Sequence, residues 1–250
     1  MQLLLITVFS VGGATILGAA FGIIFKNMVH KFKDIVLSYS YGIIMAATIY
    51  GLITPSLEYG GRYGIVITIC GILTGSIFMI IIDKFIHNFV VIKENFRESD
   101  EQIKALLLVL AIAVHNFPEG IAAGVGFGAG DVEEALFIAF GIALHNIPEG
   151  MVIIGPMLSA GISRKNTFIC AVVTGSFEIV GALVGYFAAR IEDIILPISL
   201  AFAGGIMLYV FNDEMLSKEN SGKSSPKIIL ASVIGFCTML VSDMILKYFL

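Results

Sequence analysis

The chain has 250 residues, of which 58% are apolar and only 14% charged, and its net charge is −4. Its mean hydropathy is +0.96. A soluble domain carries about a quarter charged residues, so this composition excludes an ordinary soluble protein and predicts an integral membrane protein. The charge balance contains no basic stripe and gives no reason to expect nucleic-acid binding.

Apolar segments of about 20 residues, the length that crosses a bilayer, recur along the whole chain. Only short polar joints separate them, so we expect one all-α transmembrane domain over residues 1–250. Basic residues follow the first segment and none precedes it, the reverse of a cleaved signal peptide, which makes this segment a retained span. The eight expected spans are, in order, 3–25, 35–54, 62–83, 103–128, 133–157, 166–189, 194–213 and 228–248.

The distribution of lysine and arginine predicts an orientation. Cytoplasmic joints carry an excess of both residues. With both chain ends outside, the inner joints hold 12 of them and the outer side holds 3. The outer three are Arg62, Arg190 and Lys247. We therefore expect an N-out, C-out topology.

A six-residue motif occurs twice in the middle of the chain. His115–Gly120 reads HNFPEG in the fourth span, and His145–Gly150 reads HNIPEG in the fifth. Across 111–120 and 141–150, seven of ten aligned residues are identical. Each copy places a histidine, an asparagine and a glutamate in apolar sequence.

The depth of these polar residues indicates function. His115, His145 and Glu178 each lie near the middle of a span. Glu119 and Glu149 follow one turn later on the same helix face as the histidines. Ionisable residues at this depth are costly and usually functional, although a single such histidine is often a hydrogen-bonded structural group.

The prolines of the motif add a structural expectation. Pro118 and Pro148 have no N–H and clash with a carbonyl one turn earlier, so both helices should be kinked. Irregular backbone at membrane depth is tolerated where protein or a water-filled cavity surrounds it. Similar motifs in antiparallel neighbours are typical of transporters whose site lies at a repeat interface.

Together these residues predict a metal site without thiolate ligands. Nitrogen and oxygen donors of this kind suit Zn(II), Fe(II), Mn(II) or Co(II) better than Cu(I), and three carboxylates make a two-ion site conceivable. The expected ligands are His115, Asn116, Glu119, His145, Asn146, Glu149 and Glu178. Weaker candidates are Met45, which more simply packs, and Asp213 with Glu214, which either relay ions at the inner end of the seventh span or mark its end.

The doubled motif, the eight spans and the segment TGSFEIVG around Glu178 resemble the ZIP (Zrt/Irt-like) family of metal transporters, and its bacterial branch in particular. The resemblance covers nearly the whole chain. It implies uptake of divalent metal into the cytoplasm across the cell (inner) membrane, with zinc the commonest substrate and Fe, Mn, Co or Cd as others. It also implies a binuclear site built from the seven ligands, a homodimer, and no prosthetic group. Asn146 is neutral where some relatives carry an acid.

Three functions remain open on the residues alone. The first is a metal permease without ATP hydrolysis, since no G-x-x-x-x-G-K-[ST] loop is present. The second is a membrane-embedded metal hydrolase, because the same ligands could activate water, although H-E-x-x-H is absent. The third is a sensor or structural protein that binds metal without transporting it. We expect the transporter, and not an enzyme.

Overall fold

The computed structural model describes residues 2–94, 101–128, 132–190, 195–219 and 225–249, and within these ranges it contains helices and turns but no strand. The all-α expectation is therefore confirmed for the described chain. The helices are α1 (Gln2–Ile24), α2 (Lys26–Thr48), α3 (Thr54–Tyr59), α4 (Gly64–Glu94), α5 (Glu101–Gly128), α6 (Val132–Ser159), α7 (Arg164–Ala189), α8 (Ile195–Glu219) and α9 (Pro226–Phe249). A π-helical turn, η1 (Ile49–Ile53), joins α2 to α3, and a 3-10 turn, η2 (Gly61–Tyr63), precedes α4.

Seven stretches within the described residues are helices long and apolar enough to cross a membrane. Each of them overlaps one expected span. The remaining expected span, 103–128, lies within the 28-residue helix α5. Several side chains of α5 lie outside the described set. The membrane class is therefore supported, whereas the count of eight spans and their orientation stay predictions.

The second span is longer than the sequence predicts. Helix α2 already begins at Lys26, and η1 and α3 continue it to Tyr59. Pro55 would clash with the carbonyl of Gly51 in a regular α-helix. The wider turn of η1 precedes it, with the N–H of Thr54 bonded to the carbonyl of Ile49 five residues back. Helix α4 likewise runs on to Glu94, through part of the joint expected from Lys84.

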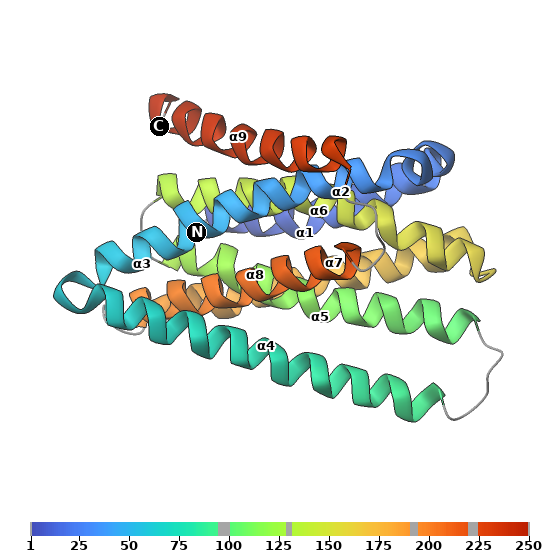
Figure 1. Cartoon of the computed structure of the whole chain (residues 1–250), viewed down its shortest axis with the longest axis horizontal. Coiled ribbons are helices and arrows are strands. Elements are labelled where there is room, and N and C mark those ends of the chain that lie inside the picture. The colour runs from blue at the N-terminus through green and yellow to red at the C-terminus, as the bar shows by residue number, and fades with distance from the viewer. Residues whose placement is uncertain (1, 95–100, 129–131, 191–194, 220–224, 250) are drawn as a thin grey trace.

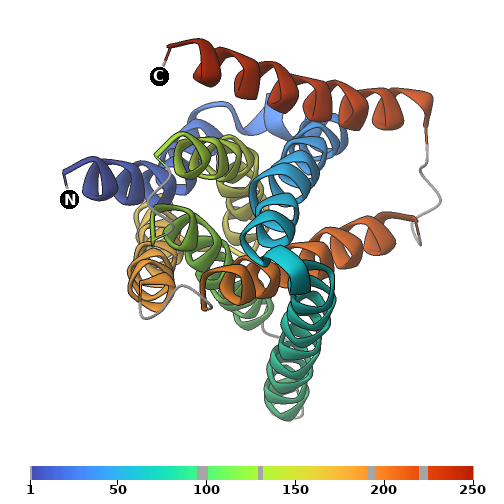
Figure 2. The same ribbon diagram turned by 90° about the vertical axis from the view of Figure 1, so that its left-hand side faces the viewer.

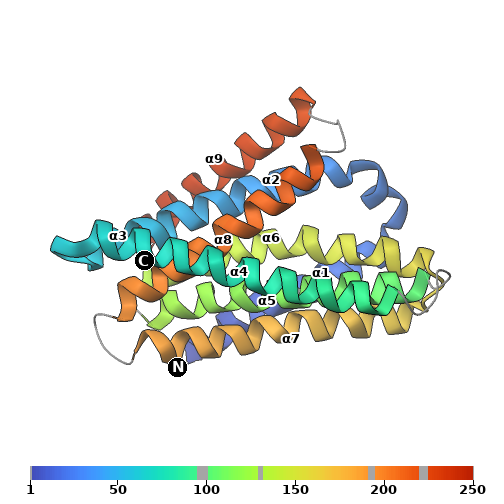
Figure 3. The ribbon, with the colours of Figure 1, turned by 60° about the horizontal axis from the view of Figure 1, so that its bottom comes forward.

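The long helices run roughly lengthwise in one bundle (Figure 1). The most extensive contacts join α5 to α7, α1 to α6, α4 to α8 and α2 to α9. Helices α1, α5, α6 and α7 also contact one another and form a four-helix group. Seen along the bundle, α4 and α9 extend from this group on opposite sides (Figure 2). The two chain ends lie toward the same end of the bundle as α3 (Figure 3).

Glycines let these paired helices approach closely. A Cβ on Gly18 of α1 would lie 2.1 Å from the carbonyl oxygen of Ile147 on α6. A Cβ on Gly181 of α7 would lie 2.1 Å from that of Phe117 on α5. Both contacts are far shorter than a carbon–oxygen contact allows, so each backbone touches the other where a side chain would separate them.

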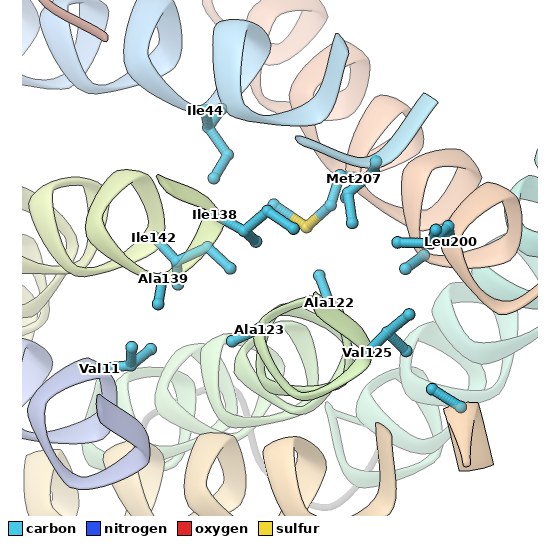
Figure 4. Close-up of a cluster of buried hydrophobic side chains, with 13 residues drawn as sticks. Val11, Ile44, Ala122, Ala123, Val125, Ile138, Ala139, Ile142, Leu200 and Met207 are labelled. Atoms are coloured by element: carbon cyan, nitrogen blue, oxygen red, sulfur yellow. The ribbon is translucent and has the colours of Figure 1, made fainter. Parts of the chain in front are cut away.

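Two apolar clusters flank the doubled motif along the helices. One gathers side chains such as Val125 and Ile138, from the parts of α5 and α6 nearest their connection, against Ile44 and Met207 (Figure 4). The other lies beyond the motif on the opposite side and includes Val109, Ile153 and Met157. Along α5 and α6 the motif residues therefore lie between two apolar clusters.

Candidate metal centre

The antiparallel neighbours α5 and α6 bring three residues of the doubled motif together. Glu119, His145 and Glu149 each offer a ligand atom, and these atoms all lie within 4.8 Å of one another. Nε2 of His145 lies 3.6 Å from Oε1 of Glu119. Because His145 and Glu149 are one helical turn apart, a single face of α6 supplies both. Three residues of the doubled motif thus form one cluster across two helices.

All three side chains of this cluster are buried, with exposed fractions of 1% for Glu119, 2% for His145 and 8% for Glu149. Burying carboxylates is costly unless charge or hydrogen bonds compensate. One imidazole and two carboxylates are a donor set that suits a borderline divalent cation such as Zn(II).

Asn116 supports the cluster from α5. The hydrogen-bond pattern orients its amide nitrogen toward Glu149, where it donates to both carboxylate oxygens at 3.2 Å and to the Ile112 carbonyl at 2.8 Å. Outer hydrogen bonds of this kind fix the orientation of a metal-binding carboxylate. Asn116 therefore contacts the cluster through a ligand.

Glu178 and Asn146 form a second polar pair. Nδ2 of Asn146 on α6 donates to Oε1 of Glu178 on α7 and lies 3.4 Å from the carbonyl oxygen of Val11. The hydroxyl of Thr15 on α1 donates to Oε2 of Glu178 at 3.5 Å. Three helices thus meet at one buried carboxylate.

The remaining candidates are placed less fully. His115 lies on α5 one turn before Glu119, but its side chain lies outside the described set. The same holds for Asp213 and Glu214 on α8. Met45 is half-buried on α2. The roles of these four residues as ligands stay predictions. Helices α5 and α6 continue past Pro118 and Pro148, and the kinks expected at these prolines also stay predictions.

Two residues beside the site were not predicted from the sequence. Thr15 is fully buried against Glu178, and the ring of Tyr41 on α2 lies 6.3 Å from that of His145, centroid to centroid. Thr15 lies near the middle of the first span, but the depth argument used for the glutamates concerns ionisable side chains and does not single out a threonine. Nothing in the local sequence marks Tyr41, because tyrosines are common in spans.

Comparison with known proteins points to one family. The family model described as "ZIP Zinc transporter" matches residues 91–243. "Zinc transporter GufA" of Myxococcus xanthus is 33% identical over 202 residues, covering 78% of this chain and 80% of that protein. "Zinc transporter ZupT" of Chlorobaculum parvum is 32% identical over 249 residues, with 92% of each covered. "Zinc transporter ZIP11" of Homo sapiens is 40% identical over 143 residues, which cover 55% of this chain and 42% of that protein.

Proposed function

Because the chain belongs to the ZIP zinc transporter family, we propose that it carries zinc through the membrane into the cytoplasm by way of the buried cluster of Glu119, His145 and Glu149. That cluster is the observation on which the proposal rests. A transporter is not an enzyme, and the relatives' names give the hydrolase alternative no support.

The three clustered side chains are the proposed core of the ion site. His115 stands one turn before Glu119 on α5, and helical register puts it on the same face. We include its imidazole as a further ligand, which would complete the four-coordinate geometry that zinc prefers. The absence of thiolate keeps binding weak enough for release, as a transported ion requires.

The enclosure of the site favours a carrier over an open pore. The cluster is buried, and apolar layers lie on both sides of it along the helices. A hydrated cation would not cross such layers without a rearrangement of the helices. The protein would thus expose the site to one side at a time, driven by the gradient of the metal.

Several finer features follow from the resemblance. We propose an N-out, C-out topology of eight spans in the inner membrane, and Fe(II), Mn(II), Co(II) or Cd(II) as further substrates. A homodimer is also proposed; native mass spectrometry would show about twice the chain mass of 26.9 kDa, and a monomer at all concentrations would exclude it.

The decisive experiment is zinc uptake into liposomes that contain the purified protein. Glu119→Gln keeps the size of the side chain but removes its charge. Even outer residues of metal sites change affinity by about 10–100-fold, so loss of a ligand carboxylate should reduce uptake at least that much. Glu58→Gln, at an exposed position on α3, is the control and should transport at the wild-type rate. Uptake by Glu119→Gln at the wild-type rate would refute the proposed site.

A further inference from the structure

Helix α1 meets the Asn146–Glu178 pair at Thr15. This threonine lies near the middle of the first expected span and has an exposed fraction of 0%. Threonine hydroxyls inside a helix commonly donate to a carbonyl of the same helix, as those of Thr48 and Thr174 do in this chain. The hydroxyl of Thr15 donates to a carboxylate oxygen of Glu178 on another helix. It therefore serves the neighbouring carboxylate.

Two atoms of α1 contact the two members of this pair. The Thr15 hydroxyl lies 3.5 Å from Oε2 of Glu178, and the carbonyl oxygen of Val11, one turn earlier, lies 3.4 Å from Nδ2 of Asn146. The same amide nitrogen donates to Oε1 of Glu178. Each oxygen of the carboxylate thus faces a donor from a different helix.

Backbone contacts on either side fix the place of Thr15. Three residues before it, Gly12 touches Gly175 of α7, because a Cβ on either glycine would overlap the carbonyl oxygen of the other. Three residues after it, a Cβ on Gly18 would overlap the carbonyl oxygen of Ile147 on α6. The hydroxyl distance is long for a hydroxyl donor, so these backbone contacts, rather than the hydrogen bond itself, keep the hydroxyl facing the carboxylate.

Glu178 needs such partners because of where it lies. Its side chain is fully buried and interacts electrostatically with the carboxylate of Glu149, which belongs to the metal-binding cluster. A buried carboxylate is costly unless hydrogen bonds compensate. Hydrogen-bond partners outside a metal site also orient the ligands within it, and their loss commonly lowers metal affinity by about 10–100-fold.

We propose that Thr15 is a positioning residue, whose hydroxyl orients the Glu178 carboxylate for zinc. It acts through Glu178 and not by contact with the ion. The inference rests on the proposed function and on the ligand role that the family resemblance implies for Glu178. It makes α1 a working part of the ion site, and it predicts that zinc affinity depends on the hydroxyl of Thr15 and not on its methyl group.

Zinc titration of the metal-depleted protein in detergent, measured by calorimetry, tests this with two substitutions at one position. Thr15→Val keeps the shape of the side chain and removes the hydroxyl, so zinc affinity should fall by about 10–100-fold. Thr15→Ser keeps the hydroxyl and removes the methyl group, so its affinity should fall by less than about threefold, below the effect of a lost orienting partner. A role in packing alone predicts the reverse order, because serine leaves a small cavity and valine does not.

Thr174 provides the matched control. It is as buried as Thr15 and lies on α7 one turn before Glu178, but its hydroxyl donates to the carbonyl of Ala171 on its own helix. Thr174→Val and Thr174→Ser should both bind zinc with wild-type affinity. Loss of affinity in Thr15→Val with recovery in Thr15→Ser supports the inference. Wild-type affinity in Thr15→Val, a loss of the same size in Thr15→Ser, or an equal loss in Thr174→Val would overturn it.

The binding measurement does not depend on transport. Zinc binding that requires the Thr15 hydroxyl, without uptake into liposomes, would leave this inference standing and refute the proposed function. Uptake that requires Glu119, together with wild-type affinity in Thr15→Val, would do the reverse.

Discussion

The two asparagines of the doubled motif make the same contact in successive helices. Asn116 of α5 donates to Glu149 of α6, and Asn146 of α6 donates to Glu178 of α7. Each copy of the motif therefore links its helix to a glutamate on the next one. In this chain the amide supplies the N–H donors that the neighbouring carboxylate accepts, whereas an ionised carboxylate at that position would have none to offer.

Asn146→Asp tests this contact directly. The substitution keeps the side-chain shape but replaces the donor that faces Glu178 with an oxygen. The loss of a buried hydrogen bond and the repulsion between two carboxylates should cost about 1–3 kcal/mol or more in the absence of metal. We expect a lower melting temperature without metal, and recovery when zinc is added, because a cation between two carboxylates offsets their repulsion.

Thermal unfolding of the purified protein, with and without zinc, measures this effect. Asn166→Asp is the control, because Asn166 is exposed near the start of α7, and its melting temperature should stay at the wild-type value. An Asn146→Asp protein as stable as wild type without metal would show that the amide–carboxylate contact does not hold α6 to α7.

At the scale of helices, the position of the site depends on how closely α1 approaches α6. A Cβ on Gly150 would lie 2.1 Å from the carbonyl oxygen of Thr15. Thr15 is also the residue whose hydroxyl donates to Glu178. The last glycine of the second motif therefore sets the separation of the helix that holds Glu149 from the helix that holds Thr15.

Gly150→Ala should push α1 away from α6, because the added methyl meets backbone that has no rotamer to change. Overpacking of this kind costs about 1–3 kcal/mol, and we expect both a lower melting temperature and slower zinc uptake. Gly155→Ala on the same helix is the matched control, since a Cβ there has nothing within 4 Å. Equal damage from the two substitutions would mean that helix flexibility, rather than close approach, explains the glycine at 150.

At the scale of the whole molecule, the sequence predicts the helices better than it predicts the contacts between them. A bilayer demands long apolar helices, and seven of the eight expected spans correspond to such helices in the described chain. Hydropathy does not locate their ends: α2 begins at Lys26 and α4 continues to Glu94, because polar residues without a helix breaker remain helical beyond the apolar stretch.

The site shows the same limit. Repetition of the motif identifies Glu119, His145 and Glu149 as partners, and the structure brings them together. The division between these residues and the Asn146–Glu178 pair depends on which residues of α1 and α7 face the motif. Hydrogen bonds between distant segments, such as that from Thr15 to Glu178, leave no spacing pattern in the sequence.

The proposed orientation has a direct test in the labelling of single cysteines. Tyr63 and Ser163 are both exposed and lie in turns that the charge distribution assigns to opposite sides of the membrane, Tyr63 outside and Ser163 inside. The natural cysteines, Cys70, Cys170 and Cys237, would first be replaced by alanine. In intact cells a membrane-impermeant maleimide should then label Tyr63→Cys and leave Ser163→Cys unlabelled, and inverted vesicles should give the opposite result. Labelling of both positions from one side would rule out an odd number of crossings between them. Labelling of Ser163→Cys alone in intact cells would show the inverted orientation, with the entrance of the zinc route at the other end of the bundle.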